Sequence, residues 1–154
     1  RLLFVRFEDD HLQSAPATAD YVLFFKKPGQ TETPVTCEVS RNDWVKWAHP
    51  FWYDIDQTNT LNAREARGEE DTKHICALQL DVIERCIRLY SNEGELVFSP
   101  FAGIGSEGVV AIKLYRRFHG IELKDEYFDA ACRNLKDTLQ SRERQGMLFA
   151  PAVP

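Results

Sequence analysis

Several features that would define a protein class at once are missing from this sequence. No apolar run approaches the roughly 18 residues that a membrane-spanning helix needs, and no basic stretch followed by an apolar one stands at the start. Cysteine is scarce, with four residues and no Cys-x-x-Cys spacing, and the histidines show no spacing typical of a metal site. We therefore expect a cytoplasmic protein with reduced thiols, no membrane contact and no bound metal.

Strong positive charge is also missing. The 19 Lys and Arg residues are outnumbered by 24 Asp and Glu residues, which gives a net charge of −5. A chain that bound nucleic acid over its whole surface would need the opposite balance, so any phosphate contact must come from a local basic face. Hydrophobic residues make up 44% of the 154 residues, which is ordinary for one globular domain. The chain starts inside an apolar run at Arg1 rather than at a methionine, and we expect it to be a piece of a longer protein.

Apolar periodicity and turn residues predict an α/β fold. Two apolar runs, 2–7 and 21–25, are expected to pair as an antiparallel hairpin. Ser40 has the side chain of a helix N-cap, and the helix that it starts is expected to end before Pro50. Further on the pattern is helix, strand, helix, strand, helix, followed by a tail, with bounds at 78–90, 95–98, 105–115, 118–123 and 125–139. Two strands joined through a helix predict a parallel pair with a right-handed crossover.

The most informative stretch is Val-Phe-Ser-Pro-Phe-Ala-Gly-Ile-Gly-Ser-Glu-Gly, residues 97–108. It predicts a buried strand, then a glycine-rich turn, then a helix, with Gly103 and Gly105 allowing unusual backbone geometry and close ligand approach. Glu122 follows Gly103 by nineteen residues, at the end of the next strand, where a carboxylate can accept hydrogen bonds from ribose hydroxyls. This pattern favours an adenosine-bearing cofactor. A nicotinamide dinucleotide and a tight turn without ligand stay open, although the roughly thirty residues after Glu122 are too few for the second half of a dinucleotide fold.

Three motifs together resemble the amino-group DNA methyltransferases, which methylate adenine N6 or cytosine N4 with S-adenosylmethionine. Residues 99–106, Ser-Pro-Phe-Ala-Gly-Ile-Gly-Ser, resemble the cofactor motif Asp-Pro-Phe-x-Gly-x-Gly of that family. Residues 120–123, Gly-Ile-Glu-Leu, followed by Tyr127 and Ala131, resemble its next motif. Residues 72–79 stand where circularly permuted, beta-class-like members carry the motif that closes over the methionine end of the cofactor.

The resemblance implies a partial Rossmann-like methyltransferase fold that depends on S-adenosylmethionine, with parallel strands and an antiparallel hairpin. It implies a site-specific DNA methyltransferase of a bacterial or phage-infected cell, with adenine N6 favoured over cytosine N4. The Trp-Tyr-Asp-Ile segment at 52–55 is similar to that of phage and bacterial DNA methylases. In the family the target base is flipped from the duplex, and its amine takes the methyl group directly. The implied cofactor-binding residues are Lys73, His74, Cys76, Ser99, Phe101, Ala102, Gly103, Gly105, Ser106, Glu122 and Leu123.

The chain also departs from the family pattern. Ser99 replaces the usual Asp at the strand end, and Ala77 stands where Pro is usual. The catalytic tetrapeptide of the family, an Asp, Asn or Ser followed by Pro-Pro and an aromatic residue, is absent. We therefore expect no catalytic residue in this chain, which alone would be inactive, and we expect the tetrapeptide in a missing N-terminal half or a partner subunit. Without the central strands, exposed apolar edges should favour self-association or instability.

The segment before the cofactor motifs is aromatic and charged, and it is a candidate DNA-facing or target-recognition region. Its candidate contacts, by base stacking and phosphate binding, are Trp44, Lys46, Arg64 and Arg67. The alternative is that this helix packs in the core and the loop is solvated. For Trp47 and Trp52 we favour the core.

These expectations divide the chain into four parts. They are a strand hairpin and loop (1–39), the aromatic and charged segment (40–71), a cofactor-binding half (72–140) and a tail (141–154). Three other functions stay open: an NAD-binding oxidoreductase fragment, a non-catalytic subunit that binds S-adenosylmethionine and DNA, and a methyltransferase that acts on RNA or protein.

Overall fold

The computed structural model describes residues 20–30, 33–36, 39–61 and 77–148. Its contacts divide the chain into two units, Arg1–Glu32 and Thr33–Pro154. The helices and strands of the described residues all belong to the second unit. Among the described residues, no helix combines the length and the apolar character that a membrane crossing requires.

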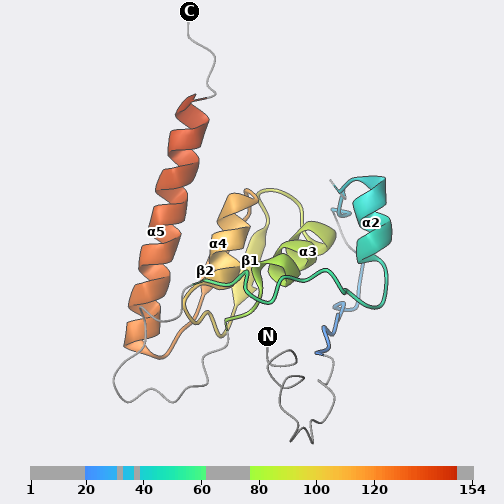
Figure 1. The fold of residues 1–154 in the computed structure, drawn as a ribbon, viewed down its shortest axis with the longest axis horizontal. Helices are drawn as coiled ribbons and strands as arrows, with labels where there is room; N and C mark the ends of the chain where they lie inside the picture. The colour runs from blue at the N-terminus through green and yellow to red at the C-terminus, as the bar shows by residue number, and fades with distance from the viewer. Residues whose placement is uncertain (1–19, 31–32, 37–38, 62–76, 149–154) are drawn as a thin grey trace, which may run out of the picture. The chain divides into compact units, whose positions relative to one another are not determined.

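The second unit is built as helix, helix, strand, helix, strand, helix (Figure 1). The elements are α2 (Arg41–Trp47), α3 (Leu80–Tyr90), β1 (Leu96–Ser99), α4 (Ser106–Lys113), β2 (Arg117–Gly120) and α5 (Asp125–Leu148). The strands β1 and β2 pair in parallel, in a register that sets Ser99 opposite Gly120, and α4 connects them. The predicted alternation of helices and strands and the predicted parallel pair are confirmed.

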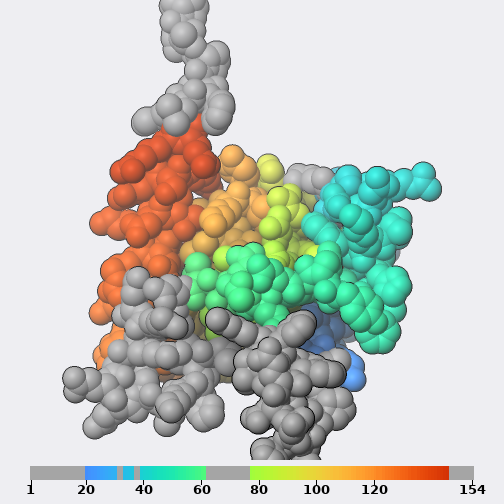
Figure 2. Space-filling model, in the orientation of Figure 1, coloured from blue at the N-terminus to red at the C-terminus, as the bar shows by residue number. Residues whose placement is uncertain are grey.

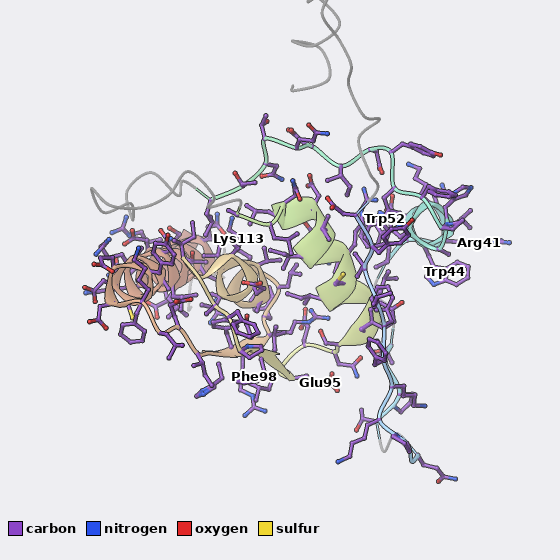
Figure 3. The ribbon with its side chains drawn as sticks, turned by 90° about the horizontal axis from the view of Figure 1, so that it is seen from below. Arg41, Trp44, Trp52, Glu95, Phe98 and Lys113 are labelled. Atoms are coloured by element: carbon purple, nitrogen blue, oxygen red, sulfur yellow. The ribbon has the colours of Figure 1, made fainter. Side chains whose placement is uncertain are left out.

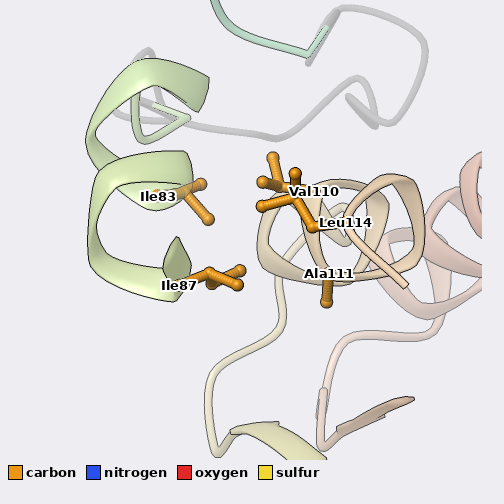
Figure 4. Packing of buried hydrophobic residues seen from close by; sticks show 5 residues of the cluster. All are labelled: Ile83, Ile87, Val110, Ala111 and Leu114. Atoms are coloured by element: carbon orange, nitrogen blue, oxygen red, sulfur yellow. The ribbon is translucent and has the colours of Figure 1, made fainter. Parts of the chain in front are cut away.

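The core lies between α3 and α4, where side chains from the two helices face each other (Figure 4). It consists of five buried residues, Ile83, Ile87, Val110, Ala111 and Leu114. Residues three or four positions apart on a helix share one face, which is why both helices present a continuous apolar side. Val97 of β1 and Phe118 of β2 pack against this cluster from the sheet. Their neighbours Phe98 and His119 point to the opposite face, where the two rings stack 5.8 Å apart.

Local sequence sets the helix ends. The Ser40 hydroxyl accepts a hydrogen bond from the Asp43 N–H at 3.1 Å, so the predicted N-cap of α2 is confirmed. The C-terminal end of α4 is closed by Tyr115. Its φ of 61° lies in the left-handed region, which usually takes glycine. The amides of Tyr115 and Arg116 donate to carbonyls one turn back in α4, at 3.1 and 2.8 Å.

The third glycine of the turn motif has a packing role. A Cβ placed on Gly108 would lie 2.5 Å from Leu135 Cδ2 and 2.6 Å from the ring of Phe118. A side chain at this position would force the side chains of Leu135 on α5 and Phe118 on β2 to shift. Gly108 therefore sets how closely the helix that follows the turn can approach its neighbours.

Two expectations about strands need correction. Residues 21–25 form no strand in the part of the chain that the structure describes, and their predicted partner, 2–7, lies outside that part. A strand needs a partner for its backbone N–H and C=O groups, so aromatic and β-branched composition alone does not make one. The strand predicted over 118–123 is Arg117–Gly120, because the chain leaves the ladder there to contact the glycine turn.

The last helix is longer than predicted. It was expected to end at Leu139, but α5 continues to Leu148, so residues 141–148 of the predicted tail are helical. The Arg142 guanidinium donates to the Ile112 carbonyl at 3.2 Å and lies over the Tyr115 ring, 5.3 Å from its centroid. These contacts with α4 stabilise the helix beyond the point where its apolar periodicity stops.

Candidate functional site

The predicted glycine turn connects β1 to α4. Gly103 (φ 53°) and Gly105 (φ 87°) both have left-handed backbone, and Gly105 is the N-cap of α4. The Gly105 N–H donates to the Ala102 carbonyl at 2.8 Å, and the Ala102 N–H donates to the Ile121 carbonyl at 2.8 Å. A Cβ built on Gly103 meets no atom of the described residues within 4 Å, so this part of the structure leaves space in front of the backbone there. The turn is thus bound to the end of β2 and open at its tip.

Glu122 is bound to this turn through its carboxylate. Oε2 accepts a hydrogen bond from the Gly103 N–H at 2.8 Å. Oε1 accepts from the N–H groups of Leu123 and Lys124, both at 3.0 Å. An ionised carboxylate offers about four acceptor positions, so three backbone donors leave about one for a ligand. Glu122 therefore holds the turn against the strand end and still presents part of its carboxylate.

Bulky apolar side chains flank the turn. Phe101 is 84% exposed and Leu123 is 93% exposed, although both are large and apolar. Exposed apolar side chains beside an open backbone surface are a feature of ligand sites rather than of a core. The turn and the end of β2 bring together the predicted cofactor residues that the structure describes, namely Ser99, Phe101, Ala102, Gly103, Gly105, Ser106, Glu122 and Leu123.

The helix α5 supports the turn from behind. Gly105 approaches Ala131 so closely that a Cβ on Gly105 would lie 3.2 Å from the Ala131 Cβ. The Asn134 side chain donates to the Ile104 carbonyl at 2.9 Å, and Tyr127 packs against the cluster that contains Ile104. Sequence reasoning missed Asn134, whose signal was a polar residue three positions after Ala131 on the inward face of the helix.

The chain segments on either side of residues 62–76 meet near the turn. Leu61 and Ala77 both pack against the cluster of Ile104. The segment that leads to Leu61 runs from α2 along the molecule toward α5 (Figure 2). It is bound to the start of α3, because the Leu80 N–H donates to the Asn59 carbonyl at 2.8 Å. Outside the described residues lie the predicted cofactor residues Lys73, His74 and Cys76 and the predicted DNA contacts Arg64 and Arg67.

The remaining candidate DNA contacts lie on α2. Trp44 is 49% exposed, and Lys46 is exposed. Figure 3 shows Trp44 and Arg41 on the outer side of α2, pointing away from α3. None of the residues of α2 is buried. This helix therefore presents an aromatic and two basic side chains to solvent.

Trp47 and Trp52 point the other way, toward Arg85 of α3. The Arg85 Cζ lies 5.5 Å from the centroid of the Trp47 ring and 5.2 Å from that of Trp52. Its Nη2 donates to Asp54 Oδ2 at 2.9 Å, and this hydrogen bond lowers the pKa of the Asp54 carboxyl. The two tryptophans are half-buried, which fits the expected packing role better than base stacking. Sequence reasoning missed Arg85, a buried arginine on the side of α3 that faces away from Ile83 and Ile87.

Two further groups near these elements, Glu107 and Cys86, have raised pKa values. Glu107 sits half-buried in the first turn of α4, and its burial raises the pKa of its carboxyl. Burial likewise raises the pKa of the Cys86 thiol on α3, whereas Cys132 on α5 is exposed. In the part of the chain that the structure describes, no group of three or more His, Cys, Asp or Glu side chains could hold a metal ion.

The fold is that of the Rossmann-like α/β methyltransferases. The structure is similar to that of a proposed DNA modification methylase of Thermus thermophilus in complex with S-adenosyl-L-methionine. The TM-score is 0.61 at 24% identity, over 84% of this chain and 49% of the other. A family model described as DNA methylase, and labelled for N6 and N4 methyltransferases, matches residues 8–133. The chain belongs to this DNA methylase family.

Curated relatives are considerably longer than this chain. It is 27% identical over 138 residues to the type II methyltransferase M.BglI of Bacillus subtilis, a match that covers 88% of this chain and 36% of the relative. It is 43% identical over 54 residues to the DNA adenine methyltransferase YhdJ of Escherichia coli K12, which covers 35% of this chain and 18% of the relative. The chain thus spans about a third or less of these relatives.

Proposed function

We propose that this chain supplies the cofactor-binding part of a site-specific DNA methyltransferase, which transfers a methyl group from S-adenosylmethionine to an exocyclic amine of a DNA base. Membership of the DNA methylase family supports the reaction. A protein of similar fold binds S-adenosyl-L-methionine, which supports the cofactor over a nicotinamide dinucleotide. The name of the Escherichia coli relative, a DNA adenine methyltransferase, supports adenine N6 as the acceptor over cytosine N4.

One contact carries the proposal: the hydrogen bond from the Gly103 N–H to Glu122 Oε2, at 2.8 Å. It joins the turn after β1 to the end of β2, at the carboxyl edge of the parallel pair, where open α/β sheets bind nucleotides. Gly103 faces open space, and the exposed Phe101 can pack against an adenine ring. The remaining acceptor position of Glu122 can take a ribose hydroxyl. The residues present therefore fit the nucleoside of S-adenosylmethionine.

In this reaction, the residues of the site orient the cofactor and take no part in bond making. When bound, S-adenosylmethionine would supply the methyl group from its sulfonium sulfur, which would leave as a neutral thioether while the base amine gains the methyl group and loses one proton. Glu122 and the glycine turn orient the nucleoside, and correct orientation supplies much of the rate in such a displacement. The tetrapeptide that would orient the target amine is absent from the 154 residues, and we assign its role to a further segment or a partner subunit.

We assign the DNA-facing surface to α2. Trp44 can stack on a base, and Lys46 can contact a phosphate, because both are exposed on one short helix. With a net charge of −5, such a local surface is the kind of DNA contact that the chain can offer. Arg64 and Arg67 stay predictions for the same surface.

Calorimetry on the full-length protein tests the cofactor site. We expect S-adenosylmethionine to bind and NADH to give no heat. Glu122→Ala should weaken S-adenosylmethionine binding at least about tenfold, since a hydrogen bond to a charged group is worth roughly 1.5–3 kcal/mol. Glu126→Ala, which removes an exposed glutamate in the first turn of α5, should change affinity less than twofold. NADH binding, or equal affinity in the two variants, would remove this proposal.

A transfer assay tests the substrate. The full-length protein is incubated with tritiated S-adenosylmethionine and unmethylated plasmid DNA, and the digested nucleosides are separated. We expect label in N6-methyladenine. Label in N4-methylcytosine would correct the acceptor, and label only in RNA or protein would overturn the DNA assignment. Cofactor binding without any transfer would favour the non-catalytic subunit.

A further inference from the structure

A buried cation stands at the junction of α2 and α3. The Arg85 side chain is 8% exposed, and a buried charge is costly unless it is paired. We propose that Arg85 is a positioning residue that fixes the DNA-facing helix α2 on the cofactor-binding half. The DNA part of this inference rests on the proposed function, whereas the contact itself does not.

Three side chains surround the Arg85 guanidinium. The rings of Trp47 and Trp52 lie 5.5 and 5.2 Å from its Cζ, within the range of a cation–π interaction. Asp54 accepts its Nη2 hydrogen bond at 2.9 Å. The Trp52 indole N–H also donates to the Trp47 carbonyl at 2.9 Å, which binds the two aromatic residues to each other. One guanidinium thus holds the end of α2 and the Trp-Tyr-Asp-Ile segment together.

Among the residues that the structure describes, α2 has few other contacts, so its position depends on this one. It has seven residues and buries none of them. A helix of that length is not stable in isolation, so its position must come from tertiary contacts. Trp52 lies between α2 and α3 in Figure 3. Its ring is one of the two that the Arg85 guanidinium contacts.

The contact connects the DNA-facing surface to the glycine turn through α3 and α4. Arg85 lies on α3 two residues after Ile83 and two before Ile87, which pack on α4. The first residue of α4, Ser106, follows the turn directly. α3 therefore contacts α2 through Arg85 and α4 through its isoleucines. The guanidinium suits this role better than a lysine would, because it is planar and can stack and donate at the same time.

The next arginine on the same helix provides a matched control. Arg88 donates to Glu84 Oε1 at 2.8 Å, one turn back on α3, and among the described residues this pair lies within one helix. Arg88→Met removes the same functional group from the same helix as Arg85→Met. Only Arg85→Met should release α2.

The test compares wild type, Arg85→Met, Arg85→Lys and Arg88→Met in the full-length protein. Hydrogen exchange should accelerate at least about tenfold in the peptides that cover 41–54 of Arg85→Met, and tryptophan emission should shift to the red. The KM for unmethylated plasmid DNA should rise at least about tenfold, while the Kd for S-adenosylmethionine stays within twofold. Arg85→Lys should recover less than half of the lost protection, and Arg88→Met should match wild type.

Equal exchange and equal KM in Arg85→Met and Arg88→Met would overturn the inference, as would a parallel loss of S-adenosylmethionine affinity. Should wild type not methylate DNA, the proposed function fails, and exchange over 41–54 alone decides the role of Arg85. Should Arg85→Met fail to fold, Asp54→Asn replaces it, because this change keeps both ring contacts and removes the charged acceptor. It should then accelerate exchange over 41–54 by about threefold, and unchanged exchange would refute the role.

Discussion

The helix α3 is held differently on its two sides. Toward α4, it contributes isoleucines to a cluster of five buried apolar residues, backed by the sheet. Toward α2, the contact consists of one guanidinium, two indole rings and one carboxylate. The apolar contact spreads its stabilisation over many atoms, whereas the polar contact depends on one charge and one geometry. The side of α3 that packs on α4 is thus built to be rigid, and the side that holds α2 to be adjustable by single side chains.

The most damaging change on the rigid side is expected at Gly108. Gly108→Ala places a Cβ 2.5 Å from Leu135 and 2.6 Å from Phe118, and overpacking of this kind costs about 1–3 kcal/mol. We expect the free energy of unfolding in urea to fall by about 2 kcal/mol. Gly94→Ala is the control, because Gly94 also stands at a turn but has nothing within 4 Å, and its φ of 77° should cost about 1 kcal/mol. Equal losses would mean that α4 is not held by close packing.

Glu122→Gln tests whether the hydrogen bonds of Glu122 stabilise the unliganded protein. The amide replaces one acceptor oxygen with a donor, which must then face a backbone N–H of Gly103, Leu123 or Lys124. An unsatisfied buried donor costs about 1–3 kcal/mol, and for this half-buried group we expect a loss of about 1 kcal/mol in the unliganded protein. Thermal unfolding of Glu122→Gln and of the exposed control Glu126→Gln measures the difference. A residue that contacts only ligand would leave the unliganded protein unchanged.

A pair of substitutions at Tyr115 separates backbone strain from packing at the end of α4. Both Tyr115→Gly and Tyr115→Ala lose the ring over which Arg142 lies, but only glycine tolerates φ 61° without cost. The glycine variant should therefore be about 1 kcal/mol more stable than the alanine variant. Chemical denaturation of the two proteins gives this difference directly. No difference would show that the left-handed turn relaxes in the variants.

Lowering the pH should change the stability contributions of Asp54 and Glu107 in opposite directions. The hydrogen bond from Arg85 lowers the pKa of Asp54, so its contribution is present above the ordinary value of about 4 and is lost as pH falls through the lowered value. Burial raises the pKa of Glu107, so its cost appears as pH rises above about 4 and is complete above the raised value. Glu107→Gln should therefore raise the Tm at pH 7 but not at pH 3.

Asp54→Asn should have the opposite effect on the Tm from Glu107→Gln. It should lower the Tm slightly at pH 7, by an effect reduced because Asp54 is 63% exposed, and should have no effect well below the lowered pKa. Melting curves of both variants between pH 3 and 7 check the signs. The same sign of pH dependence in both would contradict the assignment of one stabilising and one destabilising carboxylate.

The sequence predicted the parts of the molecule that depend on local pattern. Glycines 103 and 105 in the turn, the Ser40 cap and the apolar spacing of α3 are each written within a few consecutive residues, so their structure follows from them. The relation between Gly103 and Glu122 was also expected as a shared site. That the carboxylate would bind the turn itself was not, because a side-chain hydrogen bond over nineteen residues leaves no periodic signal.

The missed features all depend on partners distant in the sequence. Arg85 reaches Asp54 across 31 residues, and Asn134 reaches the Ile104 carbonyl across 30. Residues 21–25 were assigned to a strand from composition, although a strand is defined by its partner. The end of α5 was placed too early because its last turns are supported by the contacts of Arg142 with α4 rather than by apolar spacing.

The two described thiols offer chemical reporters for these regions. Cys86 follows Arg85 directly, and its raised pKa keeps it protonated and slow to alkylate at neutral pH. Cys132 follows Ala131, the neighbour of Gly105, and is exposed. A maleimide dye would therefore label Cys132, behind the glycine turn, before it labels Cys86, and the labelling rate at Cys86 would measure how often α3 becomes accessible to solvent.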